Sequence, residues 1–190
     1  MNATSVVLKF GSSVLADRCL PRVVHEIYRS YRRGHHVLAV VSAIGNETDR
    51  LLAEARYWST PPVPKLAVAE LLAIGERCSA ALLSMAFGRA GVQAGLLSPA
   101  GIKLMFSGEC LDAWPTSVDT QVIRQAFQMG PVLVLPGFAC VQETGGSALM
   151  GRGGTGLTAV FLAQALDAAE CCMRCGRFAT RWTACWRPSA

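Results

Sequence analysis

A glycine-rich loop in the last quarter of the chain carries the strongest chemical signal. Residues 149 to 156 read Leu-Met-Gly-Arg-Gly-Gly-Thr-Gly, and an apolar stretch follows from Val160 to Leu166. A glycine loop that opens a helix presents free backbone N–H groups and the positive end of the helix dipole to an anion. The fork of Arg152 fits a carboxylate or a phosphate. The alternative is an ordinary helix start, capped by Thr155 and without a ligand.

A lysine stands near the end of the first apolar segment. Residues Ser5 to Phe10 read as a short strand that carries Lys9, and a small-residue turn, Gly11-Ser12-Ser13, follows. Ligands of open α/β sheets collect outside the carboxyl ends of the strands. A mobile ammonium there suits the phosphates of a nucleotide. The alternative is a lysine on an edge strand that only meets water.

The elements that position these groups alternate between strand and helix, which predicts an α/β fold with a mainly parallel sheet. We expect strands at 6–10, 37–42, 92–97 and 131–135 and helices at 21–31, 48–57, 66–90, 115–128 and 155–166. Gly75 lies inside the longest helix, where glycine costs about 1 kcal/mol relative to alanine. We therefore expect a ligand or another backbone segment close to Gly75.

Composition and length indicate one domain with a real core. The chain has 190 residues, 52% of them hydrophobic and 16% charged, which excludes a disordered polymer. No apolar run reaches the roughly 18 residues of a membrane span. The N-terminus lacks a basic segment and leads directly into a strand, so we expect a cytoplasmic protein without a membrane partner. The net charge of +5 is spread along the chain before a cluster after Arg174, so we expect no nucleic-acid partner.

The eight cysteines do not have the spacing of a disulfide framework or of a zinc site. Four are isolated and read as small buried or half-buried residues: Cys19, Cys78, Cys110 and Cys140. The other four cluster in the last twenty residues: Cys171, Cys172, Cys175 and Cys185. Cys172 and Cys175 have a zinc-like spacing, but a second such pair is missing, so we expect no metal held by the protein.

Four motifs, in the same order, make the chain resemble the amino acid kinase family, and aspartokinases most closely. They are Lys9-Phe10-Gly11-Ser12-Ser13, the segment 40–52 (Val-Val-Ser-Ala-Ile-Gly-Asn-Glu-Thr-Asp-Arg-Leu-Leu), the segment 74–82 (Ile-Gly-Glu-Arg-Cys-Ser-Ala-Ala-Leu), and Pro136-Gly137-Phe138 followed by the glycine loop. The first motif is also similar to that of glutamate 5-kinase. The resemblance runs from Val6 to about Glu170. It implies a three-layer αβα sandwich formed by residues 1–170, the N-terminal, substrate-binding part of a kinase domain, with a non-family tail at 171–190.

The resemblance also implies an activity and a set of site residues. The activity is ATP-dependent phosphorylation of the β-carboxylate of aspartate, the first step toward lysine, threonine and methionine, with ATP and Mg²⁺ as cofactors and a homo-oligomer as one possible state. Lys9 would be catalytic and hold the transferring phosphate. The substrate-binding positions would be Ser42, Thr48, Glu76 and Arg152. The nucleotide phosphates would contact Gly11, Ser12, Ser13, Gly153, Gly154 and Thr155. Without a ligand, Glu76 and Arg77 would be an exposed pair on a helix surface.

The chain departs from the family at two places. The family has a catalytic aspartate where this chain has Gly156, and glycine cannot anchor a cation or organise a lysine. The family also continues with a strand and an Asp-Val-Asp-Gly loop that helps build the nucleotide site. Residues 171 to 190 show no apolar strand, and we expect no core strand after about Cys172.

A change of reading frame would explain the tail. Codons permitted for Arg177 to Pro188, read two bases later, spell Arg-Asp-x-Val-Asp-Gly-Val-Leu-Glu-Ala, which resembles the missing loop. We therefore hypothesise a truncated or frameshifted aspartokinase with little or no activity. The alternatives are a non-catalytic remnant or subunit-interaction fragment, a glutamate 5-kinase-like enzyme, and the front of a fusion with homoserine dehydrogenase.

Overall fold

The fold contains two β-sheets and six helices within the described part of the chain. A computed structural model describes residues 4–16, 19–141, 146–151 and 153–176, together with the backbone of 185–186. The central sheet has the strand order β10-β9-β1-β2-β6-β3. Its strands are β1 (Ser5–Phe10), β2 (His36–Val41), β3 (Ala94–Leu96), β6 (Val132–Pro136), β9 (Glu170–Arg174) and β10 (Cys185–Trp186). All its neighbouring pairs are parallel except β9 with β10.

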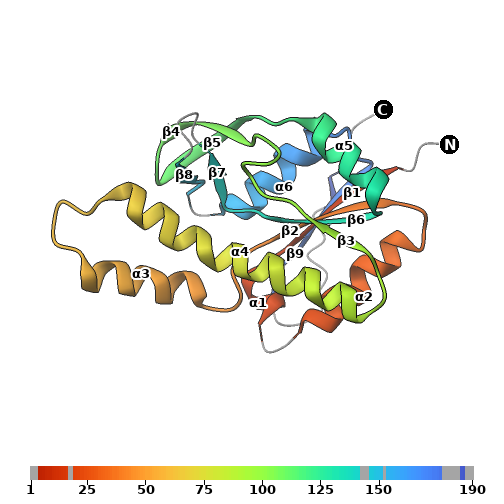
Figure 1. Cartoon of the computed structure of the whole chain (residues 1–190), viewed down its shortest axis with the longest axis horizontal. Coiled ribbons are helices and arrows are strands. Elements are labelled where there is room, and N and C mark those ends of the chain that lie inside the picture. The colour runs from red at the N-terminus through yellow and green to blue at the C-terminus, as the bar shows by residue number, and fades with distance from the viewer. Residues whose placement is uncertain (1–3, 17–18, 142–145, 152, 177–184, 187–190) are drawn as a thin grey trace.

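A smaller sheet and the helices complete the architecture (Figure 1). The second sheet has the order β5-β4-β7-β8. Its strands are β4 (Met105–Glu109), β5 (Asp112–Ser117), β7 (Ala139–Val141) and β8 (Ser147–Leu149). The helices are α1 (Ser12–Leu15), α2 (Leu20–Tyr31), α3 (Glu47–Trp58), α4 (Lys65–Arg89), α5 (Thr120–Met129) and α6 (Gly154–Ala165).

Alternate residues of the central strands pack against opposite helix layers. On β1, Val6, Leu8 and Phe10 belong to one buried cluster with residues of α2 and α4. Val7 belongs to a second cluster with residues of α5 and α6 on the other face. Successive side chains of a strand point to opposite faces, so both faces of the sheet are covered. Figure 1 shows these helix pairs on the two sides of the sheet, and the expected three-layer α/β sandwich is confirmed.

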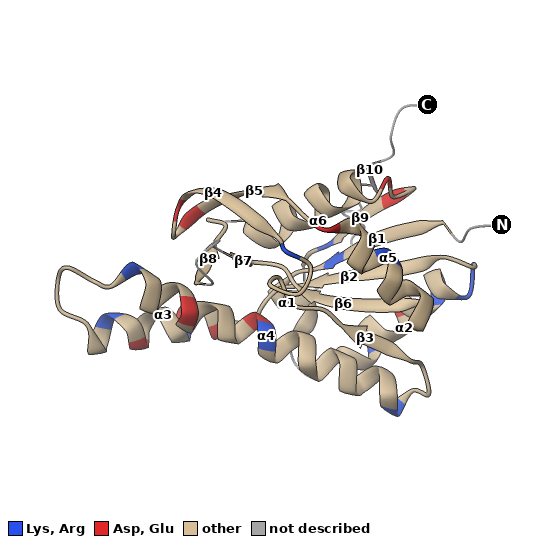
Figure 2. Ribbon diagram, turned by 45° about the horizontal axis from the view of Figure 1, so that its top comes forward, with Lys and Arg blue, Asp and Glu red and all other residues tan. Residues whose placement is uncertain are grey.

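The long helix α4 serves two cores and therefore lies at the junction of the two sheets. Its C-terminal half places Leu83 and Phe87 under the central sheet. Its N-terminal half packs Val68 and Leu72 against the region of the small sheet, together with Leu51 of α3. The α3–α4 hairpin extends beyond the central sheet, and acidic and basic residues are interspersed along it (Figures 1 and 2).

Gly75 has close neighbours, but they are side chains of the β2–α3 loop and of α3, not the ligand or backbone segment that the sequence led us to expect. A Cβ atom at Gly75 would lie 3.2 Å from Cβ of Ala43, 3.4 Å from Cγ of Glu47 and 3.4 Å from Cδ1 of Leu51. Contacts of this length leave little room for a larger residue. The absence of a side chain thus lets α3 and the β2–α3 loop lie directly on α4.

The helix expected at 115–128 begins later than predicted. Residues up to Ser117 belong to β5, where Pro115 pairs with Phe106 of β4. The Asp119 carboxylate accepts hydrogen bonds from the N–H groups of Gln121 and Val122, so α5 begins at Thr120. The sequence does not predict the extended segment in front of this cap.

The expectation that no core strand follows Cys172 is wrong for residues 173 and 174. Strand β9 runs from Glu170 to Arg174 and pairs with β1 along its whole length. Cys171 is 1% and Cys172 6% exposed, and they belong to the clusters on opposite faces of the sheet. Cysteine packs as a small apolar residue, so alternation is present although the sequence looks polar.

Part of the tail hypothesis lies outside the described residues. Residues 177–184 and 187–190, which include most of the suspected out-of-frame segment, belong to that part. The division into a domain at 1–170 and a tail at 171–190 stays a prediction, although β9 crosses that boundary. No helix among the described residues has the length and apolarity that a membrane span requires.

Candidate active site

The carboxyl ends of β1, β2 and β6 meet at one edge of the central sheet. Parallel register places Phe10 beside Val41, and Val41 beside Pro136. The backbone bonds continue past the strands, because the N–H of Ser42 donates to Phe10 O at 3.0 Å and the N–H of Gly137 donates to Val41 O at 3.0 Å. Three of the motifs found in the sequence are thereby brought to the same edge.

A buried chain of hydrogen bonds connects this edge to α4 and α6. The Ser42 hydroxyl donates to Oγ1 of Thr155 at 3.0 Å, and the Thr155 hydroxyl donates to Oε1 of Glu76 at 3.0 Å. The N–H of Phe138 donates to Oε2 of the same carboxyl. Thr155 is in the first turn of α6 and Glu76 is in α4, so four separate segments meet at one carboxyl group.

Glu76 is the electrostatic centre of the network. It is 3% exposed, and burial raises its pKa from 4.5 to about 7. Hydrogen bonds from Phe138 N–H, the Thr155 hydroxyl, and the backbone N–H groups of Gly137 and Ala43 oppose this rise because they stabilise the charged form. The carboxyl is thus close to a balance between its two protonation states at neutral pH. The alternative of an exposed Glu76–Arg77 helix pair is wrong for Glu76.

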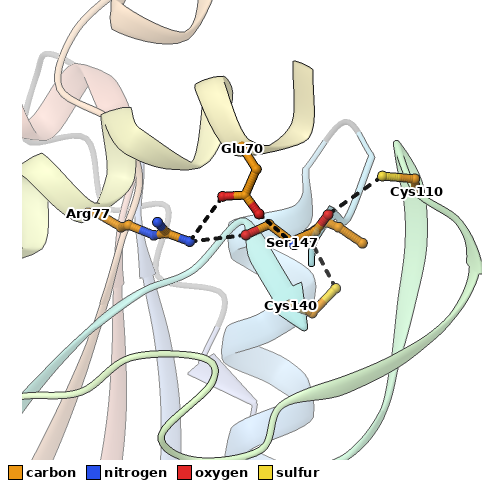
Figure 3. Close-up of polar contacts among 6 residues, drawn as sticks. Glu70, Arg77, Cys110, Cys140 and Ser147 are labelled. Carbon is orange, nitrogen blue, oxygen red and sulfur yellow. Dashed lines mark hydrogen bonds and ion pairs between the residues drawn. The ribbon is translucent and has the colours of Figure 1, made fainter. Parts of the chain in front are cut away.

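Arg77 points to a different contact, between α4 and β8 (Figure 3). Its Nη2 donates to Oγ of Ser147 at 3.0 Å and lies 3.7 Å from Oε2 of Glu70. The N–H of Ser147 donates to Oε1 of Glu70 at 2.8 Å, which closes a three-residue cycle. The thiols of Cys110 and Cys140 lie near the carbonyls of Ser147 and Ala148, beside this cycle. This group fixes the small sheet against α4 through contacts separate from the hydrogen bonds of Glu76.

Lys9 lies on the α6 side of the central sheet. It follows Val7 by two positions and therefore shares the face that packs on α5 and α6. Its neighbour on β9 is Met173, and a Cβ at Gly156 would lie 3.8 Å from Cε of Met173. Position 156 and Lys9 therefore flank the same methionine. Lys9 Nζ itself lies 3.3 Å from the thiol of Cys175.

Two glycines at this edge are required by the backbone geometry. Gly153 precedes α6 with φ of +91°, a left-handed conformation that glycine adopts without strain. At Gly137 a Cβ would lie 2.4 Å from Cγ1 of Val40 and 2.6 Å from Cγ2 of Thr155, so no larger residue fits there. Both glycines let the first turn of α6 approach the ends of β2 and β6.

The remaining predicted site residues surround this edge less directly. Ser12 and Ser13 open α1 directly after β1, and Gly45 N–H donates to Ser12 O at 3.1 Å. Thr48 lies half-buried in the first turn of α3. Arg152 lies outside the described residues, so the expectation that it shares a site with Lys9 stays a prediction. The other positions named as phosphate contacts lie at the starts of α1 and α6: Gly11, Gly153 and Gly154.

Sequence reasoning missed the backbone donors around Glu76 and the tail residue beside Lys9. The N–H groups of Ala43, Gly137 and Phe138 face the Glu76 carboxyl. The motif Pro136-Gly137-Phe138 was noticed, but a backbone donor leaves no side-chain signature in a sequence. The sequence pattern of Cys175 indicates a member of a cysteine cluster with a zinc-like spacing to Cys172, and not a partner of Lys9.

Comparison with known proteins agrees with this geometry. The sequence pattern of the amino acid kinase family matches residues 4–174. The chain belongs to the amino acid kinase family. Its similarity to aspartokinases is 35% identity over 167 residues for the Helicobacter pylori J99 protein, and 37% over 168 residues for the Mycolicibacterium smegmatis protein. Each alignment covers 87% of this chain but only 41% and 40% of the relative, so the chain spans about two fifths of these proteins.

Solved structures of the amino acid kinase family share the fold. Aspartate kinase from Synechocystis has a TM-score of 0.72 at 30% identity, over 88% of this chain and 28% of that one. Aspartokinase III from E. coli, in complex with lysine and aspartate, has a TM-score of 0.78 at 19% identity, over 88% of this chain and 48% of that one. A carbamate kinase from Giardia also matches, with a TM-score of 0.60 at 11% identity, over 89% of this chain and 70% of that one.

Proposed function

We propose that this chain forms the amino-acid-binding part of an aspartokinase-type domain, for a reaction in which ATP phosphorylates the β-carboxylate of aspartate. The observation that carries the proposal is the Ser42–Thr155–Glu76 network at the carboxyl edge of the sheet. It occurs in a chain that is 35% identical to an aspartokinase over 167 residues. A buried carboxyl with a raised pKa in such a position is typical of a functional site.

The amino acid end of the site rests on Glu76. A substrate ammonium group near the Glu76 carboxyl would favour the charged form of that carboxyl. The attraction between the two charges would oppose the effect of burial, which favours the neutral form. The Ser42 hydroxyl lies 3.0 Å from Oγ1 of Thr155 and can orient a bound substrate from the same edge. Arg152 is proposed as the partner of a substrate carboxylate, because a guanidinium binds a carboxylate with two parallel hydrogen bonds.

The phosphate end of the site rests on Lys9 and on two helix starts. Lys9 shares the sheet face that α6 covers, and the Gly11-Ser12-Ser13 turn follows it directly. The helix α6 adds a second N-terminus, whose dipole favours an anion. Phosphoryl transfer depends mainly on positioning and on neutralising charge, which are the two tasks these groups can perform.

Magnesium is not expected to be held by the described side chains alone. Within residues 4–16, 19–141, 146–151 and 153–176, no group of three or more His, Cys, Asp or Glu residues could hold a metal ion. Gly156 offers no carboxylate at the place where the resemblance implies one. Mg²⁺ usually binds through substrate phosphates with few protein ligands, so we propose that it arrives with ATP.

A binding role without efficient catalysis is the second candidate. It is favoured by Gly156 and by the thiol of Cys175, which lies 3.3 Å from the lysine that would hold the phosphate. We therefore expect substrate binding to be retained more fully than turnover. A cytoplasmic location and a homo-oligomeric state stay predictions from the sequence.

An ADP-release assay tests the proposal directly. The full chain is supplied with Mg²⁺-ATP and either aspartate or glutamate, beside Lys9→Met and the matched surface variant Lys103→Met. We expect slow, aspartate-dependent release that Lys9→Met abolishes and Lys103→Met leaves intact. Release that glutamate stimulates as strongly would favour a glutamate 5-kinase-like activity. An ordinary kinase rate in the unmodified chain would contradict the role assigned to position 156.

A further inference from the structure

A thiol and an ammonium group meet at the carboxyl edge of the central sheet. Nζ of Lys9 lies 3.3 Å from Sγ of Cys175. Lys9 is the next-to-last residue of β1, and Cys175 directly follows β9, the parallel neighbour of β1. Cys175 is exposed among the described residues.

The backbone holds Cys175 over the turn that follows β1. On one side of it, Arg174 O accepts a hydrogen bond from the N–H of Gly11 at 2.9 Å. On the other side, the N–H of Gly176 donates to Oγ of Ser13 at 3.2 Å. The backbone is thus held on both sides of Cys175, and the place of its thiol beside Lys9 follows from the register of β9.

The turn after β1 leaves the Lys9 ammonium open because Gly11 has no side chain. A Cβ at Gly11 would lie 3.2 Å from Nζ of Lys9 and 3.5 Å from Sγ of Cys175. Gly11 therefore leaves space over both groups. Reactive thiols in proteins occur in partly exposed, electropositive surroundings of this kind.

We propose that Cys175 is a thiol–disulfide exchange site that favours anionic disulfides, and that Lys9 attracts the incoming reagent. In the reaction, the Cys175 sulfur loses its proton and attacks one sulfur of a small disulfide such as oxidised glutathione. A new S–S bond forms at Cys175, the S–S bond of the reagent breaks, and the departing thiolate takes up the proton. The disulfide reagent is the only oxidant, and one thiol is released for each protein modified.

The mixed disulfide has a consequence for the proposed function, on which this step rests. The group attached to Cys175 is an anion held next to Lys9, so it occupies the position at which Lys9 would meet a phosphate. Modification of Cys175 and phosphate binding at Lys9 therefore exclude each other. A chain with modified Cys175 would lose its nucleotide affinity until a thiol reductant removes the adduct.

The chain supplies its own reference thiol. Cys78 is also exposed and lies on α4, next to Arg77. That arginine is engaged by Ser147 and Glu70, so its charge is partly compensated. Cys140, Cys171 and Cys172 are buried and should react slowly with either reagent.

The test compares two small disulfides of opposite charge on the full chain. Oxidised glutathione is a net anion and cystamine is a dication, and peptide mass spectrometry measures the adduct at each cysteine over time. The readout is the rate at Cys175 divided by the rate at Cys78, for each reagent. We expect this ratio to be about tenfold higher for glutathione disulfide than for cystamine, as electrostatic steering of that size is common.

Variants identify the source of the preference. Lys9→Met should bring the two ratios close together, whereas Lys9→Arg should keep them apart. Lys103→Met removes one exposed lysine elsewhere, beside Asp119, and should behave as the unmodified chain. Equal ratios in the unmodified chain, or a preference that survives Lys9→Met, would overturn the inference.

A pyrophosphate arm separates this inference from the proposed function. Pyrophosphate that binds Lys9 should slow the reaction of Cys175 with glutathione disulfide and leave Cys78 unaffected. If Cys175 prefers glutathione disulfide over cystamine but pyrophosphate does not slow its reaction, the result would support the exchange site and count against the phosphate role of Lys9. If pyrophosphate slows the reaction of Cys175 but Cys175 shows no preference between the two disulfides, the result would support that phosphate role and overturn the exchange site.

Discussion

The Thr155 hydroxyl donates a hydrogen bond to Oε1 of Glu76 at 3.0 Å, and this contact joins the first turn of α6 to the middle of α4. Thr155 is 6% and Glu76 3% exposed, so water does not readily replace either partner. The same threonine accepts the hydrogen bond of Ser42, which extends the connection to the end of β2. One hydroxyl thus sets the relative position of three elements around the candidate site.

Removal of that hydroxyl should destabilise the fold. Thr155→Val keeps the shape of the side chain but removes the acceptor of the Ser42 hydroxyl and the only side-chain donor that the described residues give to Glu76, which keeps its backbone donors. We expect a loss of about 1–3 kcal/mol in the free energy of unfolding, measured by urea denaturation. Thr155→Ser keeps the hydroxyl and serves as the control, with a smaller loss. A larger loss in Thr155→Ser than in Thr155→Val would show that packing of the methyl group, not the hydrogen bond, is the stabilising feature.

The stability of the chain should fall as the pH rises through the range in which Glu76 ionises. Burial raises its pKa in the folded state to about 7, above the ordinary 4.5 of an unfolded chain. The folded state therefore binds the Glu76 proton more tightly than the unfolded state does. This contribution to stability is complete below pH 4.5 and is lost as the pH rises through about 7. The change is on the order of 3 kcal/mol. Urea midpoints from about pH 5 to 8 should show this decline in the unmodified chain and not in Glu76→Gln.

Glu70 lies on the same helix and provides a control, because its ionisation should change the stability with pH in the opposite direction to that of Glu76. Hydrogen bonds from Ser147, with a smaller contribution from the charge of Arg77, hold its pKa below the ordinary value. Its contribution to stability is therefore present above the ordinary pKa and is lost as the pH falls through the lowered one. A decline toward high pH that disappears in Glu70→Gln but persists in Glu76→Gln would contradict the assignment.

Two glycines near the site should respond differently to substitution. A side chain at Gly156 would meet Met173 at 3.8 Å, an ordinary contact distance, and a carboxylate in the first turn of α6 favours the helix dipole. Gly156→Asp should therefore leave the melting temperature nearly unchanged or raise it. Gly137→Ala places a methyl group 2.4 Å from Val40 and should cost about 1–3 kcal/mol. A loss of stability in Gly156→Asp as large as that in Gly137→Ala would contradict the space inferred at position 156.

Strand β9 should be needed for a stable sheet although it belongs to the part of the sequence expected to be irregular. It pairs with β1 from Val6 to Phe10, and Nη2 of Arg174 lies 2.7 Å from Oε1 of Glu26 on α2. A chain that stops after Gly176 should keep a cooperative thermal transition by circular dichroism. A chain that stops after Ala169 should lose it, because β1 would become an exposed edge. Similar transitions in both chains would show that β9 is dispensable.

The sequence predicted β2 and β6 of the central sheet well because these strands are continuous apolar runs. The residues of β2 from Val37 to Val41 are all fully buried between two helix layers, and such a run shows in composition alone. In the small sheet, β7 and β8 were missed because they have three residues each, too few for a periodic pattern. Strand β9 was missed because its place depends on the open edge of β1, which is a tertiary effect and not a local preference.

The candidate site was predicted in outline rather than in detail. The sequence motifs named Glu76 and Ser42 before any geometry was known, and the structure joins them through Thr155. Thr155 itself was assigned to phosphate, a role that stays a prediction. The distance between Lys9 and Cys175 could not be read from the sequence, because 165 intervening residues separate two groups that only the strand order brings together.

The central claim is that Glu76 is the centre of an amino acid site of the aspartokinase type, and isothermal titration of the full chain with aspartate tests it most directly. We expect aspartate to bind, glutamate to bind at least about tenfold more weakly, which is roughly 1.4 kcal/mol, and Glu76→Gln to abolish aspartate binding. Glu70→Gln changes a carboxylate of α4 that contacts Ser147 and Arg77 instead of the Glu76 network, and it should bind aspartate as the unmodified chain does. Aspartate binding that is unchanged in Glu76→Gln, or equal affinity for aspartate and glutamate, would contradict the claim.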